Sequence, residues 1–290
     1  MTEADAARPE QRPQSSWFAL PEPLRRVFAR FPIVSYSANV LPQNAPQHRS
    51  QHVFFSFQRP GGPADAPSCN PTCLKWQTLL KFQGVSHKIQ PSNNHASPSG
   101  ALPFILPANT ANQRPGTPVS ASKIPRWIVS QGGREETLQP KEEAYNALVD
   151  HDIRNAWLYF IYLDQPNFKA VAAPLYCESA SSNVLVQLAM ASQLQSAARD
   201  ELLKSYILID ADELYDRAAK AFSALSTLLG GDDNFFGASQ PGLFDASVFA
   251  YTHLLLDDSM NWQTSTMIDL LKIHPNLVSH QQRLRAEYFP

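Results

Sequence analysis

The residues best suited to chemistry stand close together in the chain: Ser68, Cys69, Asn70, Thr72 and Cys73. A cysteine beside a helix N-terminus has a lowered pKa, because the free backbone N–H groups stabilise the thiolate, so Cys69 is a candidate nucleophile. The two cysteines stand four residues apart, one more than in the C-x-x-C motif of thiol–disulfide oxidoreductases. We therefore predict structural packing for Cys73 and a half-exposed Cys69, with a regulatory disulfide between them as the alternative.

Other catalytic and metal-binding patterns are not indicated. Besides the two cysteines, the nearby candidate ligands are His52, His87 and His95, and no second ligand pair stands at zinc-finger spacing. The sequence has no phosphate loop, nucleophile elbow or paired-carboxylate motif. We predict no metal site and no catalytic residue.

One acidic residue, Asp245, stands in the otherwise apolar stretch of residues 237–256. Pro241 and Gly242 are typical of a helix start, and a carboxylate three residues after Gly242 can accept a hydrogen bond from its backbone N–H. The same carboxylate lies favourably at the positive end of the helix dipole. Apolar residues on most sides of the following helix predict a central, buried position. Asp245 is therefore expected to cap this helix.

Composition limits the class of protein. The chain has 290 residues, enough for two domains, and a net charge of -2, so no strongly basic surface indicates nucleic acid as a partner. No apolar run reaches the roughly 20 residues of a membrane span. The N-terminus has no apolar core of a secretory signal, and three cysteines are an odd number, so we expect reduced thiols and a cytosolic environment.

Proline divides the chain into two parts. Eighteen of the 24 prolines lie at or before Pro125, where short runs predict strands and loops. We expect one helix in this part, capped by Asn70 and ending near Gly84. The predicted strands are residues 52–57, 85–89, 101–106 and 123–131. After that, helical periodicity predicts helices over residues 141–165, 183–205, 211–231 and 243–256, and two shorter ones within 264–289.

A separate feature is a short basic amphipathic pattern before the first strand, between Pro23 and Pro32. A helix there is too short to persist alone, so something must cover its apolar stripe. The chain's own body, a protein partner and an anionic lipid surface are the three alternatives. This pattern is our candidate partner-binding site, with apolar and basic members Leu24, Arg25, Arg26, Val27, Phe28, Arg30 and Phe31.

The order of these elements resembles the glutathione-transferase (GST) fold. The resemblance implies an N-terminal extension (residues 1–50), an α/β thioredoxin-like domain (51–133) and an all-α domain (134–290). Pro103 resembles the proline that this fold places before its third strand, commonly in cis. Two departures argue against glutathione chemistry: the loop at residues 59–68 is long, and the family's Glu-Ser pair has no counterpart in residues 130–137.

Three segments, residues 70–85, 101–107 and 235–256, together resemble the metaxin branch of this fold, and in particular the fungal-type subunits without a membrane anchor. The resemblance implies a non-enzymatic protein without cofactor, peripheral on the cytosolic face of the mitochondrial outer membrane. Its implied partners are the outer-membrane β-barrel assembly subunit, a second metaxin-like subunit of the sorting and assembly machinery, and precursor β-barrel proteins, whose β-signal it helps to recognise. Contact with the membrane surface is a further implied interaction.

The physical form of such recognition is an extended segment that pairs with a sheet edge. The proline-rich loops at residues 59–68 and 91–100 are the predicted borders of a groove for that segment. Two other functions stay open: a divergent glutathione transferase, and a GST-like assembly module of a cytosolic complex.

Overall fold

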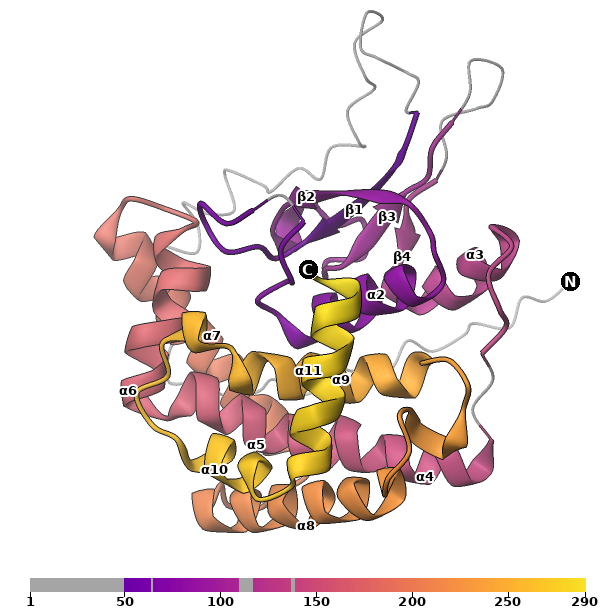
Figure 1. Cartoon of the computed structure of the whole chain (residues 1–290). Coiled ribbons are helices and arrows are strands. Elements are labelled where there is room, and N and C mark those ends of the chain that lie inside the picture. Colours follow the sequence, from indigo (N-terminus) through magenta and orange to yellow (C-terminus); the bar gives the residue numbers. More distant parts are fainter. Residues whose placement is uncertain (1–49, 64, 110–116, 137–138) are drawn as a thin grey trace, which may run out of the picture. The chain divides into compact units, whose positions relative to one another are not determined.

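The structure, a computed structural model, describes residues 50–63, 65–109, 117–136 and 139–290. Within these ranges a four-stranded sheet with its helices precedes a helical domain (Figure 1). The fold class predicted from the sequence, an α/β thioredoxin-like domain followed by an all-α domain in a GST-like arrangement, is confirmed. The predicted N-terminal extension lies outside the described residues, except for Ser50.

The sheet has the strand order β2-β1-β3-β4. The strands are β1 (His52–Ser56), β2 (His87–Pro91), β3 (Phe104–Leu106) and β4 (Val119–Ser120). β1 pairs with β2 in parallel and with β3 antiparallel, so that Phe54 lies opposite both Ile89 and Ile105. A parallel pair needs a crossover, and helix α2 (Pro71–Phe82) provides it. β2 is therefore an edge strand.

Helix α2 begins and ends where the sequence predicts. Asn70 Oδ1 accepts a hydrogen bond from the Cys73 N–H at 3.2 Å, and Pro71 occupies the first turn. Gly84, with φ of +64°, takes the left-handed conformation after the last turn. The helix buries Leu74 and Leu80.

The predicted fourth strand at residues 123–131 is wrong. Those residues form helix α3 (Ile124–Ser130), and β4 has only two residues before it. Pro125 lies in the first turn, where its fixed φ suits a helix. Ile124 and Ile128 are four residues apart, so both reach the apolar cluster around Phe54 from one helix face.

The first long helix ends at Leu163, close to Pro166 as expected, because Asp164 has an extended backbone. A second difference is the segment that follows, for which we predicted no helix. Pro166 lies in the first turn of α6 (Gln165–Asn167), with Asp164 accepting from the Asn167 N–H at 3.2 Å, and the chain continues as the π-helical segment η5 (Phe168–Glu178). Apolar residues at helical spacing, such as Phe168, Val171 and Ala172, bury one side of it.

The other helices agree in position with the sequence-based prediction. The first long one comprises α4 (Pro140–Ala147), η3 (Leu148–Ile153), α5 (Arg154–Leu158) and η4 (Tyr159–Leu163). It is followed by α7 (Val184–Leu202), α8 (Ala211–Leu229), α9 (Leu243–Leu256), α10 (Thr266–Lys272) and α11 (Pro275–Tyr288). Short helical turns complete the chain at η1 (Asn94–Ala96), η2 (Ala121–Lys123), η6 (Phe235–Gly237) and η7 (Asp258–Met260).

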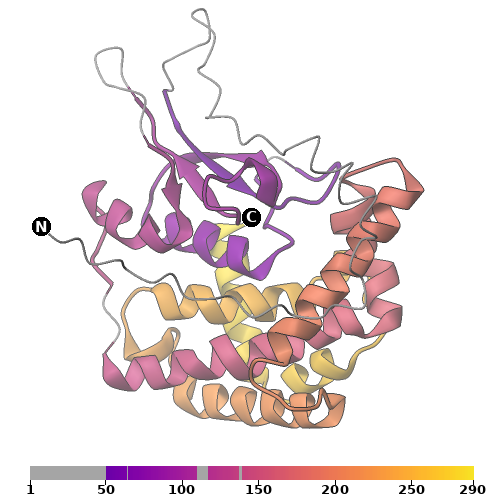
Figure 2. The same cartoon turned by 180° about the vertical axis from the view of Figure 1, so that it is seen from behind.

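Helix α9 connects the cores of the two domains (Figures 1 and 2). Val248, Phe249 and Leu254 belong to the large cluster of the helical domain, whereas Ala246 belongs to the cluster beneath the sheet. Helices α2 and α11 pack against α9. The prediction of a central, buried helix after Asp245 is confirmed.

Candidate functional site

The start of α2, where the sequence placed the candidate nucleophile, is closed. Cys69 is only 4% exposed and Cys73 is fully buried, so the expectation of a half-exposed Cys69 is wrong. Burial raises the pKa of Cys69 to about 11 and that of Cys73 to about 12, which outweighs any stabilisation by the helix start. Both thiols are therefore protonated at neutral pH, and neither forms a disulfide.

Polar groups around these thiols are already engaged. Ser68 Oγ donates to the Phe57 carbonyl at 2.5 Å, and the Ser68 N–H donates to Gln77 Oε1 at 2.8 Å. Tyr176, from η5, covers the helix start: its hydroxyl lies 3.4 Å from Asn70 Nδ2, and its ring meets Phe57 edge-on at 5.2 Å. This arrangement is that of a packed helix start.

The loop before β3 is satisfied internally in the same way. The Leu102–Pro103 peptide bond is cis, as the fold resemblance implied. The Leu102 N–H donates to Asn94 Oδ1 at 3.0 Å, and Ser97 Oγ donates to the Ala101 carbonyl at 2.7 Å. The backbone donor beside the cis proline is thus occupied by the chain itself.

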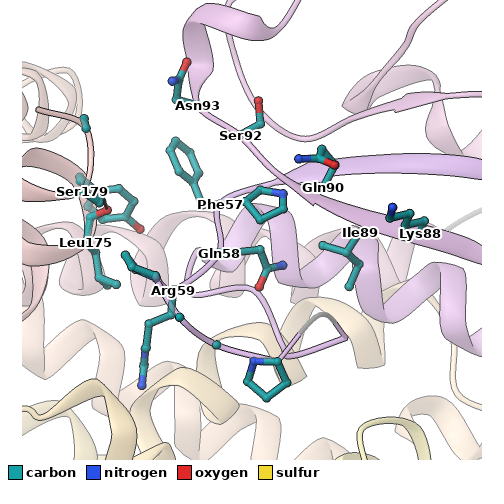
Figure 3. A pocket seen from close by; sticks show the side chains of 17 residues that line it. Phe57, Gln58, Arg59, Lys88, Ile89, Gln90, Ser92, Asn93, Leu175 and Ser179 are labelled. Atoms are coloured by element: carbon teal, nitrogen blue, oxygen red, sulfur yellow. Dashed lines mark hydrogen bonds between the residues drawn. The ribbon is translucent and has the colours of Figure 1, made fainter. Parts of the chain in front are cut away.

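An open concave site lies beside β2, which we call the edge groove. It has a volume of about 670 Å³. Both predicted border loops contribute to it, but the wall supplied by η5 was not predicted. In Figure 3, Leu175 and Ser179 stand on one side, Ile89 and Gln90 on the other, and Phe57 between them. The edge groove is formed by residues 57–63 and 88–93 together with Leu175, Tyr176, Ser179 and Ala180.

The open edge of β2 borders this groove. The Ser92 N–H donates to the Ser56 carbonyl at 3.0 Å. Since backbone groups of alternate residues point to the same side of a strand, Lys88 and Gln90 also face β1, and Ile89 turns its N–H and C=O outward. Within the described ranges β2 pairs with β1 alone. Pro91 has no N–H, so Ile89 is the last donor along this edge.

The groove is apolar and aromatic at its floor, with amide side chains at its rim. Phe57 and Leu175, both half-buried, supply most of the apolar surface, since Ile89 is only 5% exposed, and Gln58 and Gln90 are among the polar side chains. Of its two basic residues, Arg59 is engaged elsewhere, with its guanidinium 3.7 Å from Asp257 and 3.2 Å from Met260 Sδ, whereas Lys88 is exposed at the groove. Such a site fits an extended, largely uncharged chain segment, which gains backbone hydrogen bonds from the edge and apolar contact from the floor.

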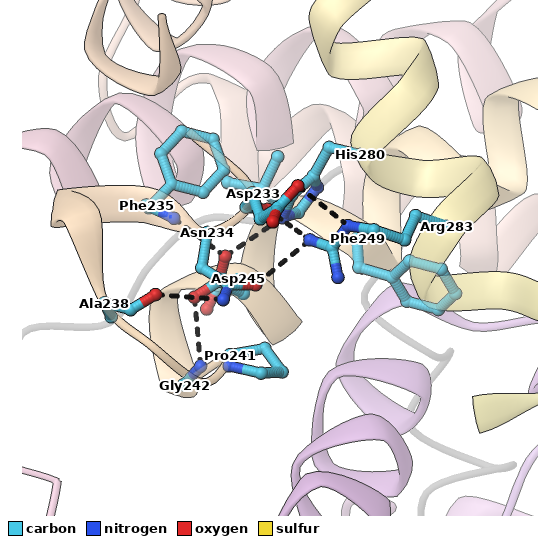
Figure 4. Close-up of polar contacts among 12 residues, drawn as sticks. Asp233, Asn234, Phe235, Ala238, Pro241, Gly242, Asp245, Phe249, His280 and Arg283 are labelled. Atoms are coloured by element: carbon cyan, nitrogen blue, oxygen red, sulfur yellow. Dashed lines mark hydrogen bonds and ion pairs between the residues drawn. The ribbon is translucent and has the colours of Figure 1, made fainter. Parts of the chain in front are cut away.

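A second polar cluster surrounds the start of α9 (Figure 4). Asp245 Oδ2 accepts from the Gly242 N–H at 2.9 Å, which confirms the predicted cap. Its Oδ1 accepts from the Phe235 N–H at 3.0 Å and lies 2.9 Å from His280 Nε2. Asp245 is buried, so its lone pairs are used within the fold. This cluster holds α9, the preceding loop and α11 together.

Glu136 supplies the other half of this cap from a distant part of the sequence. Its carboxylate accepts from the Leu243 N–H and from Gln83 Nε2, and lies 3.8 Å from the Arg134 guanidinium. A Cβ atom at Gly242 would stand 2.9 Å from Glu136 Oε2, so the glycine leaves room for the carboxylate. Burial raises the pKa of Glu136, against the lowering effect of these partners.

The candidate partner-binding residues lie outside the described residues, and their role stays a prediction. They are Leu24, Arg25, Arg26, Val27, Phe28, Arg30 and Phe31.

Comparison with known proteins relates this chain to glutathione transferases and to metaxins. Residues 71–167 match the family described as Glutathione S-transferase N-terminal domain, and residues 218–284 match Glutathione S-transferase, C-terminal domain. Metaxin-1 of Macaca fascicularis is 26% identical over 239 residues, which cover 77% of this chain and 72% of that protein. The chain is thus similar to metaxins in sequence, and it carries both glutathione S-transferase domain types. Metaxin-1 of Homo sapiens is also 26% identical, and the match covers 49% of its length.

Solved glutathione transferases are similar to this chain at lower identity. Glutathione S-transferase III in its apo form is 15% identical, with a TM-score of 0.46 over 82% of this chain and 92% of that one. A glutathione S-transferase of Ceriporiopsis subvermispora, in complex with glutathione, is 15% identical with a TM-score of 0.48, over 82% and 98%.

Among the parts of the chain that the structure describes, no helix combines the length and apolar composition needed to cross a membrane.

Proposed function

We propose that this metaxin-like protein is a non-enzymatic subunit of the sorting and assembly machinery of the mitochondrial outer membrane. It lies on the cytosolic face, bound to the barrel-forming subunit and to a second metaxin-like subunit, and helps to receive the β-signal of precursor β-barrel proteins. The observation that carries this proposal is the edge groove, which joins an unpaired strand edge to an apolar floor.

Recognition in this groove begins with the backbone. A β-signal is an extended segment that still lacks strand partners, and Ile89 offers it one N–H and one C=O. Side chains of the segment then pack on Phe57 and Leu175, while the amide rim contacts its backbone. Because Pro91 ends the row of donors, only a short stretch pairs, which sets the register of the bound segment.

A non-enzymatic role agrees with the state of the thiols. A nucleophilic cysteine needs an accessible, low-pKa thiolate, whereas the pKa values of Cys69 and Cys73 are raised and both side chains are buried. The hydroxyl of Ser68 is also buried and donates to the backbone.

Site-specific photo-cross-linking tests the proposal. A photoreactive residue at Ser179 or Gln90, both exposed at the groove, is expected to cross-link a peptide that carries a β-signal. The same residue at Lys220, on the solvent side of α8, serves as the matched control and should give no adduct. Ser179→Trp should fill the groove and reduce cross-linking from Gln90 by about tenfold or more. Equal yields from Gln90 and Lys220 would rule the groove out as the receptor site.

A further inference from the structure

The N-terminal end of α7 is unusual for a helix in contact with water. Val184 is 64% exposed, Leu185 77%, Val186 43% and Leu188 62%. Single exposed apolar residues are common, but four within five positions form a patch, and such patches are typical of protein or membrane interaction sites. The ribbon at the start of α7 lies at the periphery of the helical domain in both views (Figures 1 and 2). We call residues 181–188 the α7 tip.

The buried residues of α7 lie beyond its tip, and Ala191 is the first residue of the helix that packs against the core. Ala198 and Leu202 are buried in the helical core, with Leu194 packed against it, and Gln195 Nε2 donates to the Tyr162 carbonyl at 3.1 Å. At the tip, consecutive residues 184–186 are all exposed, although consecutive residues of a helix point in different directions. The tip is thus open on several sides, and a flat protein surface can cover only one of them.

Charge distinguishes the tip from the rest of the surface. Residues 179–198 contain no Asp, Glu, Lys, Arg or His, although charged residues make up 17% of the chain. Helix α8, which like α7 has 19 residues, carries Asp212, Glu213, Asp216, Arg217 and Lys220. A charge-free, apolar projection is complementary to the acyl layer of a lipid bilayer, where charged side chains are costly.

Polar groups at the tip are paired among themselves. The Leu185 N–H donates to Asn183 Oδ1 at 2.9 Å, and the Asn183 N–H donates to Ser181 Oγ at 3.1 Å. Gln187 Nε2 donates to the Ser181 carbonyl at 2.7 Å. These bonds lower the cost of removing the helix start from water, a cost that otherwise opposes entry into lipid.

We propose that the α7 tip is a membrane wedge, whose side chains enter the outer part of a lipid bilayer. Lipid surrounds an inserted tip on all sides, which matches the distribution of its exposed apolar residues. Since the tip has no basic residue, insertion depends on apolar contact and not on anionic headgroups. The inference does not use the edge groove, and it adds a direct lipid contact to the protein contacts of the proposed function.

Vesicle flotation with the purified full chain tests the wedge. Wild-type protein is expected to bind phosphatidylcholine vesicles, with little change when salt is raised or when anionic lipid is added. Leu185→Glu combined with Leu188→Glu should weaken partitioning by at least about tenfold, because two charges then enter the apolar layer. Unchanged thermal unfolding would show that the variant is folded, as expected for exposed positions.

The matched control is Ile207→Glu with Leu208→Glu, beyond the other end of α7. Those two residues are also exposed and apolar, but they lie between the charged residues Lys204 and Asp210. This control should keep vesicle binding. Failure of the wild-type protein to float, equal loss in both double variants, or binding that needs anionic lipid and disappears at high salt would each overturn the wedge. An apolar protein partner would then be the occupant, and the cross-linking result at the edge groove would be unaffected.

Discussion

At the scale of single residues, two carboxylates share the start of α9. Asp245 stands three positions after Gly242, whose N–H donates a hydrogen bond to its carboxylate, so the sequence predicts this contact. Glu136 stands 107 positions from Leu243, and only the folded chain brings the two together. The glycine at position 242 is the local sign of this arrangement, because it provides space that a larger residue would fill.

A double-mutant cycle tests this interpretation. Glu136→Ala removes the acceptor for the Leu243 N–H and should lower the free energy of unfolding by about 1–2 kcal/mol. Gly242→Ser should destabilise the wild type, because its Cβ meets Glu136, but should stabilise the Glu136→Ala protein, because its hydroxyl can cap the helix. Urea unfolding of the four proteins measures both effects. The same effect of Gly242→Ser in both backgrounds would contradict the shared cap.

The thiols give a second test at this scale. Burial raises the pKa of Cys69 and Cys73, and also that of Cys177. A thiol reagent at neutral pH should therefore label none of the three in the folded protein at a rate near that of a free cysteine. Labelling should become rapid in denaturant, which serves as the control. Fast modification of Cys69 in the folded protein would contradict this expectation and would favour the enzyme or redox alternative.

At the scale of elements, helix starts were predictable and the identity of short apolar segments was not. Asn70 and Asp245 are local signals, so the beginnings of α2 and α9 could be predicted from a few neighbouring residues. The segment that forms α3 is apolar and short, and such a run suits a strand or a helix until its neighbours are known. Pro174 lies inside η5, and no helix was predicted there, although η5 supplies one wall of the edge groove. The two loops of that groove could be predicted from the sequence. Their position beside η5 could not, because it depends on tertiary packing.

His253, which contacts Gln281 between α9 and α11, makes the free energy of unfolding depend on pH. Burial lowers the pKa of His253 from 6.5 to about 4, with Arg285 and Arg59 acting in the same direction and Asp257 against it. Between these values the unfolded chain binds a proton that the folded chain does not, so stability falls as pH decreases below 6.5. The loss should reach on the order of 3 kcal/mol near pH 4. Urea unfolding between neutral pH and about pH 5 measures the slope.

A suitable control is His253→Asn. The amide oxygen that this substitution introduces can replace the ring Nδ1 as the partner of Gln281 Nε2, which lies 3.0 Å from His253 Nδ1 in the structure. This variant should be less stable at neutral pH, since it loses the ring stacked on Phe249, but its stability should change less with pH. A slope equal to that of the wild type would show that another group titrates.

At the scale of the whole molecule, the described residues form a GST-like fold, and the N-terminal extension holds the predicted partner-binding site. The predicted domain limits, at residues 50/51 and 133/134, stay a prediction. The location at the outer membrane belongs to the proposed function, in which the edge groove is the proposed contact for a protein segment and the α7 tip is the proposed contact for lipid.

The N-terminal pattern has its own test in mitochondria. Val27→Asp with Phe28→Asp places two charges on the predicted apolar stripe and should reduce recovery of the barrel-forming subunit with this protein. Arg25→Gln with Arg26→Gln is the companion variant, which keeps the stripe and lowers the charge. Loss of recovery only in the second variant would favour an electrostatic contact over an apolar one. Wild-type recovery with both Asp changes would move the docking site to another part of the chain.

The proline at position 91 also limits how long any strand can stay at the sheet edge. Individual hydrogen bonds contribute only about 1 kcal/mol net, and a pairing edge with two outward residues, His87 and Ile89, before a proline provides few of them. A segment held this way should exchange quickly, which suits the proposed role as a receptor. The same brevity protects the sheet from growing by addition of further chains, because an edge without a continuous row of donors is a poor template for aggregation.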